Sequence, residues 1–326
     1  MFVRRGRFAV ALVVAALALT ACGSDSSSPT TEGAGGKQAL TVATQPDFFG
    51  IPLYFAVQKG FLAKQGIEAK LQEFPTGVEG TEAVVTGQAD LTSVAGYPVA
   101  SLAAKGAKVK IIGHNATSYG WWGIVVDSSI ATPQDLYGKT IALQSNSTAS
   151  YWFDRFVAFH KLDKSKIKVK DAKYAQLVPT FAKGDVNAII HFEPNVTKAI
   201  SARPGARLGW AGGDDDLLPF IGYVVAGPKI FENQEVGVKV LRALRETSAY
   251  MKSNQGEVIE FIKSKTGITD DAEAKKILAK IDFSLAFDPA SVDQIQQVAD
   301  YQLEMGNIKN KVDAKSYVIT DWVNAI

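Results

Sequence analysis

Three places in the sequence carry polar residues where a helix is expected to begin. Ser145-Asn146-Ser147-Thr148 puts four helix-capping residue types before an amphipathic segment at Tyr151–Phe159. Thr76-Gly77-Val78-Glu79 fits a capping box, and Gly96-Tyr97-Pro98 opens a third helix with Pro in its first turn. Helix N-termini offer free N–H groups and the positive end of the helix dipole. These starts therefore predict sites for an anionic or polar ligand group.

The four capping residues at 145–148 exceed what one helix needs. A single cap uses one side chain, so Asn146, Ser147 and Thr148 are candidate ligand-binding residues. Thr76 has two interpretations, because it can serve only as a cap. Gly77 beside it would let a ligand approach the backbone closely.

Aromatic residues gather in the same loops. Core packing is the default role for most of them, and Tyr54 lies on an apolar helix that needs core residues. Phe48 and Tyr97 follow strands directly and are better candidates for the walls of a ligand site. We include Tyr54 with them in the predicted site. Ring faces suit an organic ligand better than a small inorganic ion.

Glu193 lies in a turn after a buried strand. There it would repel an anionic ligand unless it is paired, and it would suit an amine or an N–H-bearing heterocycle. Alternatively, it faces the hinge or caps the helix at Pro194. His191 shares its strand face, but without a third nearby ligand we predict no metal site.

The N-terminus has the pattern of a secretion signal. Three arginines precede an apolar run from Phe8 to Leu19, twelve residues long, whereas a helix that spans a bilayer needs about 20. The run ends in Leu19-Thr20-Ala21-Cys22, which resembles the lipobox of bacterial lipoproteins. That resemblance implies removal of residues 1–21, lipidation of Cys22 and an extracytoplasmic, membrane-anchored location. Residues 22–37 are rich in Gly, Ser and Thr and are expected to form a flexible tether.

Composition excludes several classes of protein. The net charge is +2, but without residues 1–21 the chain has 32 basic and 33 acidic residues. No basic cluster with interleaved aromatics follows, so we expect no nucleic-acid partner. The single Cys excludes a disulfide framework and Cys-based metal sites, and no cofactor motif appears.

From Leu40 onward, apolar strand-like runs alternate with amphipathic helices, which predicts an α/β protein with mostly parallel sheets flanked by helices. After Pro228 the pattern is helical to the end. The expected strands are Leu40–Ala43, Ile67–Phe74, Leu91–Val94, Val109–Gly113, Gly123–Val126, Thr140–Leu143, Ala188–Phe192 and Gly222–Ala226. The stretch from Gly87 through Asp90 to Pro98 has a partial echo from Gly184 through Asn187 to Pro194, which favours two lobes of similar construction.

Several stretches resemble the periplasmic-binding-protein-like substrate carriers of ABC importers, in the group that serves sulfonates, taurine, nitrate and thiamine-pyrimidine precursors. The matching segments are Ile51–Phe61, Glu73–Gly77, Gly87–Leu91, Asp135–Ala142 and Phe192–Pro194. The resemblance implies a two-lobed periplasmic-binding-protein-like type II fold that closes about a hinge. Lobe 1 is expected at 38–126 and 227–326, and lobe 2 at 127–226. Gly123, Gly222 and Gly227 flank the expected crossovers and are either hinge residues or ordinary strand-end glycines.

The resemblance implies a monomeric binding component that captures a small organic solute, of sulfonate type, and delivers it to the membrane permease. A nitrogen heterocycle is the alternative ligand, favoured by Glu193 and the aromatics. Pyrimidine-forming enzymes with this fold use a cysteine-rich motif, which the chain lacks after Cys22, so we expect no enzyme. A surface adhesin is the remaining alternative.

Overall fold

The computed structural model describes residues 38–47, 49–213 and 219–326, which belong to one compact unit. The predicted signal peptide, Cys22, the tether and Phe48 lie outside the described residues. Within the described part, no helix combines the length and apolar character needed to cross a membrane.

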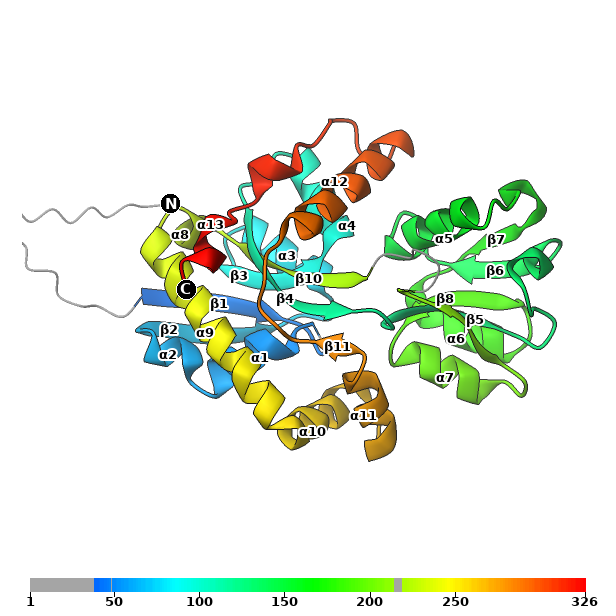
Figure 1. Ribbon diagram of the computed structural model, residues 1–326, viewed down its shortest axis with the longest axis horizontal. Coiled ribbons are helices and arrows are strands. Elements are labelled where there is room, and N and C mark those ends of the chain that lie inside the picture. The colour runs from blue at the N-terminus through cyan, green and yellow to red at the C-terminus, as the bar shows by residue number, and fades with distance from the viewer. Residues whose placement is uncertain (1–37, 48, 214–218) are drawn as a thin grey trace, which may run out of the picture. The chain divides into compact units, whose positions relative to one another are not determined.

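The strands form two sheets, one in each lobe (Figure 1). The six-stranded sheet has the order β11-β4-β10-β3-β1-β2, and the five-stranded sheet has the order β7-β6-β8-β5-β9. The strands are β1 (Gln38–Thr44), β2 (Ile67–Glu73), β3 (Leu91–Ala95), β4 (Lys110–Ser118), β5 (Trp122–Val126), β6 (Thr140–Leu143), β7 (Lys168–Asp171), β8 (Ala188–Phe192), β9 (Arg207–Ala211), β10 (Phe220–Ala226) and β11 (Ile281–Asp282).

Helices connect these strands and make up most of the C-terminal third. The helices are α1 (Ile51–Gln58), α2 (Phe61–Lys64), α3 (Gly77–Val85), α4 (Gly96–Ala104), η1 (Pro133–Leu136), α5 (Thr148–Phe159), η2 (Lys164–Lys166), α6 (Tyr174–Ala182), α7 (Asn195–Ala202), α8 (Pro228–Phe231), α9 (Gln234–Ser253), α10 (Gln255–Thr266), α11 (Asp271–Leu278), α12 (Pro289–Glu304), η3 (Ala314–Tyr317) and α13 (Asp321–Asn324).

Each sheet contains one strand that enters from the other lobe. β5 runs antiparallel to β8 and β9, and β10 runs antiparallel to β3 and β4, whereas β1–β2, β1–β3, β6–β7 and β6–β8 are parallel pairs. A chain that enters a lobe from the cleft side meets the carboxyl edge of its parallel strands, so it must run against them. The sheets are mostly parallel, as predicted, since β1, β2, β3 and β4 share one direction and β6, β7, β8 and β9 share another, but each sheet has an antiparallel strand inside it.

This insertion also shifts the lobe boundaries predicted from sequence. β5 pairs in the five-stranded sheet and β10 in the six-stranded sheet, so the chain crosses between β4 and β5 and returns between β9 and β10. The predicted boundaries at 126 and 227 put each of these strands in the wrong lobe. β11, which pairs with β4, also contradicts the expectation that strands cease after Pro228.

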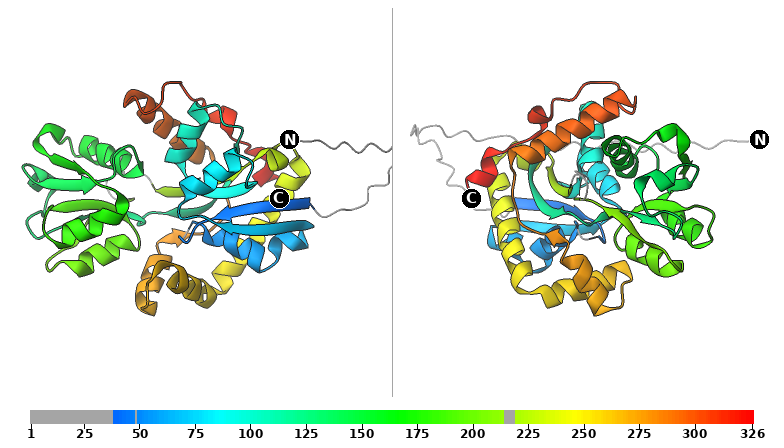
Figure 2. Two further views of the ribbon diagram at one scale, coloured as in Figure 1. Left: turned by 180° about the vertical axis from the view of Figure 1, so that it is seen from behind. Right: turned by 45° about the vertical axis from the view of Figure 1, so that its right-hand side comes forward.

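Alternate residues of β5 bury themselves against helices on opposite faces of the sheet. Ile124 and Val126 belong to the core that contains α5, whereas Val125 belongs to the core with α6 and α7. All three side chains are fully buried, which explains the continuous apolar run at this point in the sequence. Figure 2 shows helices on both sides of the strands in the green part of the chain.

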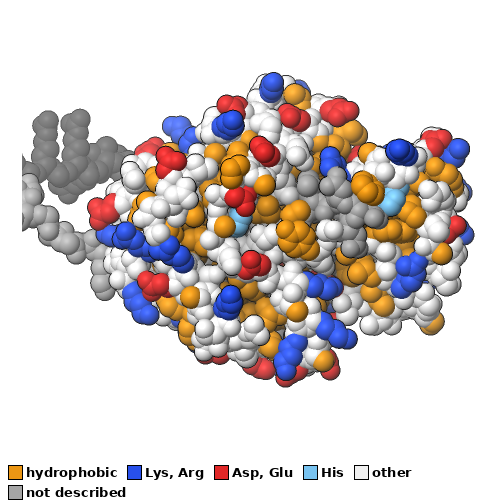
Figure 3. Space-filling view, viewed as in Figure 1, with side chains coloured by type: hydrophobic (Ala, Val, Ile, Leu, Met, Phe, Trp, Pro, Cys, Tyr) orange, Lys and Arg blue, Asp and Glu red, His pale blue; other side chains and the backbone are white. Residues whose placement is uncertain are grey.

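The C-terminal helices cover the six-stranded sheet. α9 packs against α1 and α2, and α12 packs against α4. Leu241 and Leu244 of α9 share one core with Leu53 and Leu62, which ties the two ends of the described chain together. On the face seen in Figure 3, lysine and arginine side chains are interspersed with aspartate and glutamate.

The internal echo in the sequence corresponds to the same backbone corner in both lobes. Asp90 N–H donates to Thr41 O (2.7 Å), and Asn187 N–H donates to Thr140 O (2.8 Å). In return, Thr41 N–H donates to the Asp90 carboxylate (2.8 Å) and Thr140 N–H to Asn187 Oδ1 (3.1 Å). The two lobes thus fasten β1 and β6 in the same way.

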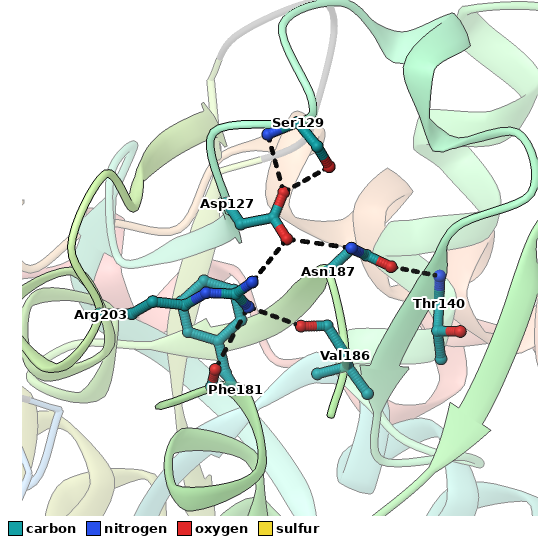
Figure 4. Close-up of polar contacts among 7 residues, drawn as sticks. All are labelled: Asp127, Ser129, Thr140, Phe181, Val186, Asn187 and Arg203. Atoms are coloured by element: carbon teal, nitrogen blue, oxygen red, sulfur yellow. Dashed lines mark hydrogen bonds and ion pairs between the residues drawn. The ribbon is translucent and has the colours of Figure 1, made fainter. Parts of the chain in front are cut away.

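In the five-stranded lobe, this corner extends into a buried polar network around Asp127 (Figure 4). The Asp127 carboxylate accepts hydrogen bonds from the Ser129 N–H (2.9 Å) and hydroxyl (2.6 Å), from Asn187 Nδ2 (3.0 Å) and from Arg203 Nη2 (2.8 Å). Arg203 also donates to Val186 O (2.8 Å). The network joins the end of β5 to the residues that flank β8 and α7.

Burial by itself raises the pKa of Asp127, but the hydrogen bonds from Ser129 and Asn187 and the charge of Arg203 outweigh it and lower the pKa. A lowered pKa in the folded state means that the stabilisation is present above the ordinary pKa of 3.8 and is lost as pH falls through the folded-state value.

Asp127→Ala should lower the free energy of unfolding at pH 7 by roughly 2–4 kcal/mol, because it leaves Arg203 and Asn187 without their buried acceptor. The difference from wild type should shrink below about pH 4. Urea unfolding across this pH range measures both effects. Asp185→Ala, at an exposed site in the same lobe, is the control and should change stability little. A pH-independent loss would contradict the assigned role of the Asp127 charge.

Candidate functional site

A cavity of about 670 Å³ is lined by residues from both lobes. Gln45 follows β1, Ala95 ends β3, Gln144 follows β6 and Phe192 ends β8, and all four line it. The cavity thus lies at the carboxyl ends of parallel strands, where loops of an α/β fold are free to bind a ligand. Six of the predicted site residues line it: Thr76, Gly77, Tyr97, Asn146, Ser147 and Thr148.

The start of α5 supplies the polar wall on one side. Ser147 is the N-cap: its Oγ accepts from Ala149 N–H (3.1 Å) and from the Tyr174 hydroxyl (2.9 Å), and it donates to Gln144 O (2.6 Å). Burial raises the pKa of Tyr174 to about 12, so this phenol stays a donor. The Ser147 hydroxyl is therefore fully used by the protein.

Asn146 and Thr148 differ from Ser147 in this respect. Among the described residues, neither side chain has a hydrogen-bond partner, although both residues line the cavity. Asn146 has φ = 52°, in the left-handed region that Asn tolerates better than most residues. Their side chains are thus available to a ligand at the first turn of α5.

The start of α3 lies on the wall contributed by the other lobe. Thr76 forms the predicted capping box: Glu79 N–H donates to its Oγ1 (3.5 Å), and Thr76 N–H donates to Glu79 Oε2 (2.9 Å). The Thr76 side chain is therefore committed to the cap. Gly77 is packed closely, because a Cβ there would meet Val94 Cγ2 at 3.0 Å and Gln45 Nε2 at 3.2 Å.

Aromatic rings form the apolar part of the lining. The ring centroid of Phe49 lies 4.9 Å from Trp121 and 4.5 Å from Phe220, and that of Trp122 lies 5.3 Å from Phe192. Tyr97 lines the cavity too, but its hydroxyl accepts a hydrogen bond from Asn307 Nδ2 (3.1 Å). Such a wall suits an organic body with ring or alkyl surface.

Asp47, which the sequence reading missed, places a carboxylate in the cavity. Burial raises its pKa to about 6, against the lowering effect of hydrogen bonds from Gly50 N–H (3.0 Å) and Phe49 N–H (2.9 Å). Glu79 and Glu82 also line the cavity, whereas no Lys, Arg or His does so within the described residues. Any anionic group of a ligand must therefore rely on neutral donors.

Gln45, two residues before Asp47, is 3% exposed, and its side-chain oxygen lacks a hydrogen-bond donor within the described part of the chain. Its Nε2 donates to Ser93 O (3.0 Å), but its Oε1 has no partner among the described residues. Gln45 and Asp47 directly follow a predicted strand, and that position is the signal by which sequence reasoning could have found them. Phe192, at the end of a predicted strand, had a comparable signal, whereas Tyr174 and Phe220 line the cavity through long-range packing and offered none.

Tyr54 does not line the cavity, contrary to the expectation from sequence. Its ring lies 4.3 Å from that of Phe261 in α10, and Lys265 Nζ lies 5.8 Å from the Tyr54 ring centroid. This side of α1 faces the C-terminal helices, so Tyr54 has the core-type role that its apolar helix indicated.

Glu193 is also outside the cavity lining. It is 1% exposed, and its carboxylate accepts hydrogen bonds from Thr197 N–H (3.1 Å) and the Thr197 hydroxyl (3.0 Å). Lys280 Nζ, from the segment between α11 and β11, pairs with it at 2.8 Å. Glu193 thus caps its own helix and links the lobes, which corrects the expectation that it would bind a ligand.

Comparison with known proteins gives one family match. The family model described as NMT1/THI5 like matches residues 45–258. A putative aliphatic sulfonates-binding protein from Bacillus subtilis (strain 168) is 24% identical over 283 residues, which cover 83% of this chain and 83% of that protein.

Solved structures show the fold. The periplasmic aliphatic sulphonate binding protein SsuA from Escherichia coli superposes with a TM-score of 0.78 at 22% identity, covering 87% of this chain and 92% of that one. A desulfurization enzyme, DSZB, superposes with a TM-score of 0.68 at 14% identity, covering 88% and 98%. These matches confirm the two-lobed periplasmic-binding-protein-like fold.

Lys280→Met should lower the free energy of unfolding by about 2 kcal/mol, because it leaves the buried Glu193 carboxylate without its cation. A fully buried pair would lose more, but a third of the Lys280 side chain is exposed. Thermal unfolding of the double variant Glu193→Gln/Lys280→Met should recover most of the loss. If the double variant is as unstable as Lys280→Met, the pair is not the cause.

Proposed function

The chain belongs to the NMT1/THI5-like family, and from this premise we propose that it is the extracytoplasmic substrate-binding component of an ABC importer. It captures a small organic solute of sulfonate type between its lobes and delivers it to the permease. The observation that carries this proposal is the 670 Å³ cavity at the strand ends of both lobes. Its size and its mixed aromatic and polar lining suit a small organic molecule.

The ligand class is supported by the name of the Bacillus subtilis relative and by the two helix starts at the cavity. A sulfonate is a monoanion whose oxygens accept hydrogen bonds, and the N-termini of α3 and α5 supply N–H groups and positive dipole ends. The aromatic wall would hold the organic body.

Closure of the lobes would deliver the ligand, because contacts from both sides favour the closed state. We place lobe 1 at 38–118 and 220–326 and lobe 2 at 122–211, with one hinge at 119–121. Gly123 and Gly222 are poor hinge candidates: a Cβ would meet Leu208 Cδ1 at 2.5 Å at the first and Phe49 Cδ1 at 2.7 Å at the second. Gly227 caps α8 at the far end of β10.

The sequence features at the N-terminus complete the proposal. A signal at residues 1–21, lipidation of Cys22 and a tether would hold a monomeric carrier on the outer face of the cell membrane, near its permease. Globomycin-sensitive processing and labelling of Cys22 with a palmitate analogue test this anchor, and a Cys22→Ala variant released from membranes is the expected result.

Catalysis has no support in the cavity, although an enzyme shares the fold. A surface adhesin would gain no stability from a small molecule, whereas a carrier should melt at a higher temperature with its ligand. Glu193 does not line the cavity and therefore does not support a nitrogen heterocycle as the ligand. Asp47 and Gln45 Oε1 are, however, hydrogen-bond acceptors at the cavity wall. The negative charge of Asp47 should weaken the binding of a sulfonate and strengthen the binding of a cationic heterocycle.

Thr148→Ala should weaken the binding of butane-1-sulfonate or benzenesulfonate by about tenfold, the value of one hydrogen bond to a charged group, and Asn146→Gly should weaken it by a smaller factor, the value of a neutral polar contact. Gly rather than Ala replaces Asn146 because it keeps φ = 52° without strain. Titration calorimetry measures the affinities, and exposed Asn324→Ala is the control. Unchanged affinity in both variants would remove the start of α5 from the site.

Sulfonate affinity should rise roughly threefold as pH falls from 7.5 to 5, because protonation of Asp47, with its pKa of about 6, removes a repulsive charge. Asp47→Asn should bind more tightly at pH 7.5 and lose the pH dependence. A cationic heterocycle would show the reverse: weaker binding at low pH and in Asp47→Asn. An Asp47→Asn variant with the wild-type pH profile would contradict the role of this carboxylate.

A further inference from the structure

A second, smaller cavity of about 40 Å³ adjoins the wide one. The two cavities share lining residues, among them Tyr97, Trp122, Thr148 and Phe220. Both lobes contribute: Gly96 and Gln294 come from one, Tyr151 and Trp152 from the other. A volume of this size can hold a small chemical group but not a whole organic solute.

Three residues that line this small cavity each carry a buried hydrogen-bond donor without a partner among the described residues: Trp122 Nε1, the Tyr151 hydroxyl and Trp152 Nε1. The three residues are 5%, 6% and 4% exposed, respectively. Leaving a donor buried and unpaired is costly, and native structures rarely do so without a reason such as a ligand or an ordered water. Three such groups around one cavity make an unusual concentration.

Each of these three groups can donate a hydrogen bond to an anion. An indole N–H can only donate, and burial raises the pKa of Tyr151, so that its hydroxyl also stays protonated. α4 and α5 begin at Gly96 and Thr148, which both line the cavity with the positive ends of their helix dipoles. Asp47, Glu79 and Glu82 line only the wide cavity.

We infer that this small cavity is the subsite for the anionic head of the ligand, where the two indole N–H groups and the Tyr151 hydroxyl donate to the oxygens of a sulfonate. This inference rests on the proposed function and deepens it. The organic body then lies in the wide cavity along the aromatic rings. The head is thereby kept apart from the three carboxylates.

The absence of any charged side chain in the described lining of the small cavity determines which anion it accepts. Neutral donors cannot compensate the dehydration of a dianion, and a carboxylate concentrates its charge on two oxygens. A sulfonate spreads one charge over three oxygens and loses little hydration. The subsite should therefore prefer a sulfonate to a phosphonate or carboxylate with the same organic chain.

The donor atoms are covered in this structure, since each exposes almost no surface. Because the lining comes from both lobes, a small rotation of one lobe against the other uncovers them, and closure buries the head group again. Binding of the head is in this way coupled to the movement that the proposed function requires.

Amide and indole NMR of the full mature chain tests the contact directly. The protein has five Trp residues, whose indole N–H signals are distinct probes. On addition of butane-1-sulfonate, the Trp122 and Trp152 signals should move strongly downfield, whereas those of Trp210 and Trp322, outside both cavities, should stay in place. Static Trp122 and Trp152 signals at saturation would overturn the inference.

Tyr151→Phe and Trp152→Phe remove one donor each and keep an aromatic ring. We expect each to weaken butane-1-sulfonate binding by about tenfold; Tyr151→Phe should leave the melting temperature of the ligand-free protein unchanged or higher, whereas Trp152→Phe should lower it because core packing is lost. Tyr317→Phe, whose hydroxyl donates to Ala103 O far from the cavity, is the control with wild-type affinity. Butane-1-phosphonate and pentanoate should bind wild type at least tenfold more weakly than the sulfonate.

The outcomes separate the two proposals. If wild type binds sulfonates and both variants bind them equally well, the subsite is wrong and the proposed function stands. If wild type binds no sulfonate in calorimetry, the proposed ligand class fails, and the subsite fails with it. If a variant does not fold, the indole shifts of the wild-type protein decide.

Discussion

The two strands that cross between the lobes impose the constraint on which the rest of the structure depends. β5 and β10 each lie inside the sheet of the lobe they enter, so the six-stranded sheet is built from two separate stretches of chain, with the five-stranded sheet inserted between them. Because both strands enter from the carboxyl edges of the parallel strands, these edges face the crossovers. The cavity, the helix starts and the aromatic rings next to the crossovers all follow from that arrangement.

The wide and the small part of the cavity suit different chemical groups of a ligand. Its wide part has three carboxylates and an aromatic wall, whereas its small extension has no charged side chain among the described residues and combines neutral donors and two helix starts with apolar side chains. A ligand with an anionic head and an organic body has one orientation in which both ends are satisfied. This division explains how a site without a described cationic side chain can suit an anion, and why Asp47 would tune affinity without preventing binding.

Sequence reasoning predicted the parts of the structure that depend on local interactions. The capping box at Thr76, a helix cap within residues 145–148, the strands with continuous apolar runs and the echo between Asp90 and Asn187 are predicted from neighbouring residues, whereas the choice of Ser147 as the cap is not. It missed three strands: β7, whose four residues are all exposed and three of them charged, β9, and β11, which has only two residues. It also assigned β5 and β10 to the wrong lobes, since strand pairing depends on partners distant in sequence. Glu193 shows the same limit in the site: its cation, Lys280, is 87 residues away.

The Glu193–Lys280 pair also affects how the lobes can separate. Lys280 passes over the first crossover, where a Cβ on Gly120 would meet its Cδ at 2.9 Å, and reaches a carboxylate that water scarcely touches. A cross-lobe bond on the opposite side, from the Tyr301 hydroxyl to Asp154 (2.6 Å), joins α12 to α5 beside an open surface groove. Water and salt compete far more readily at the second contact than at the first. The lobes should therefore part first along α5 and α12. The ion pair between Glu193 and Lys280 then lies close to the axis about which the lobes rotate.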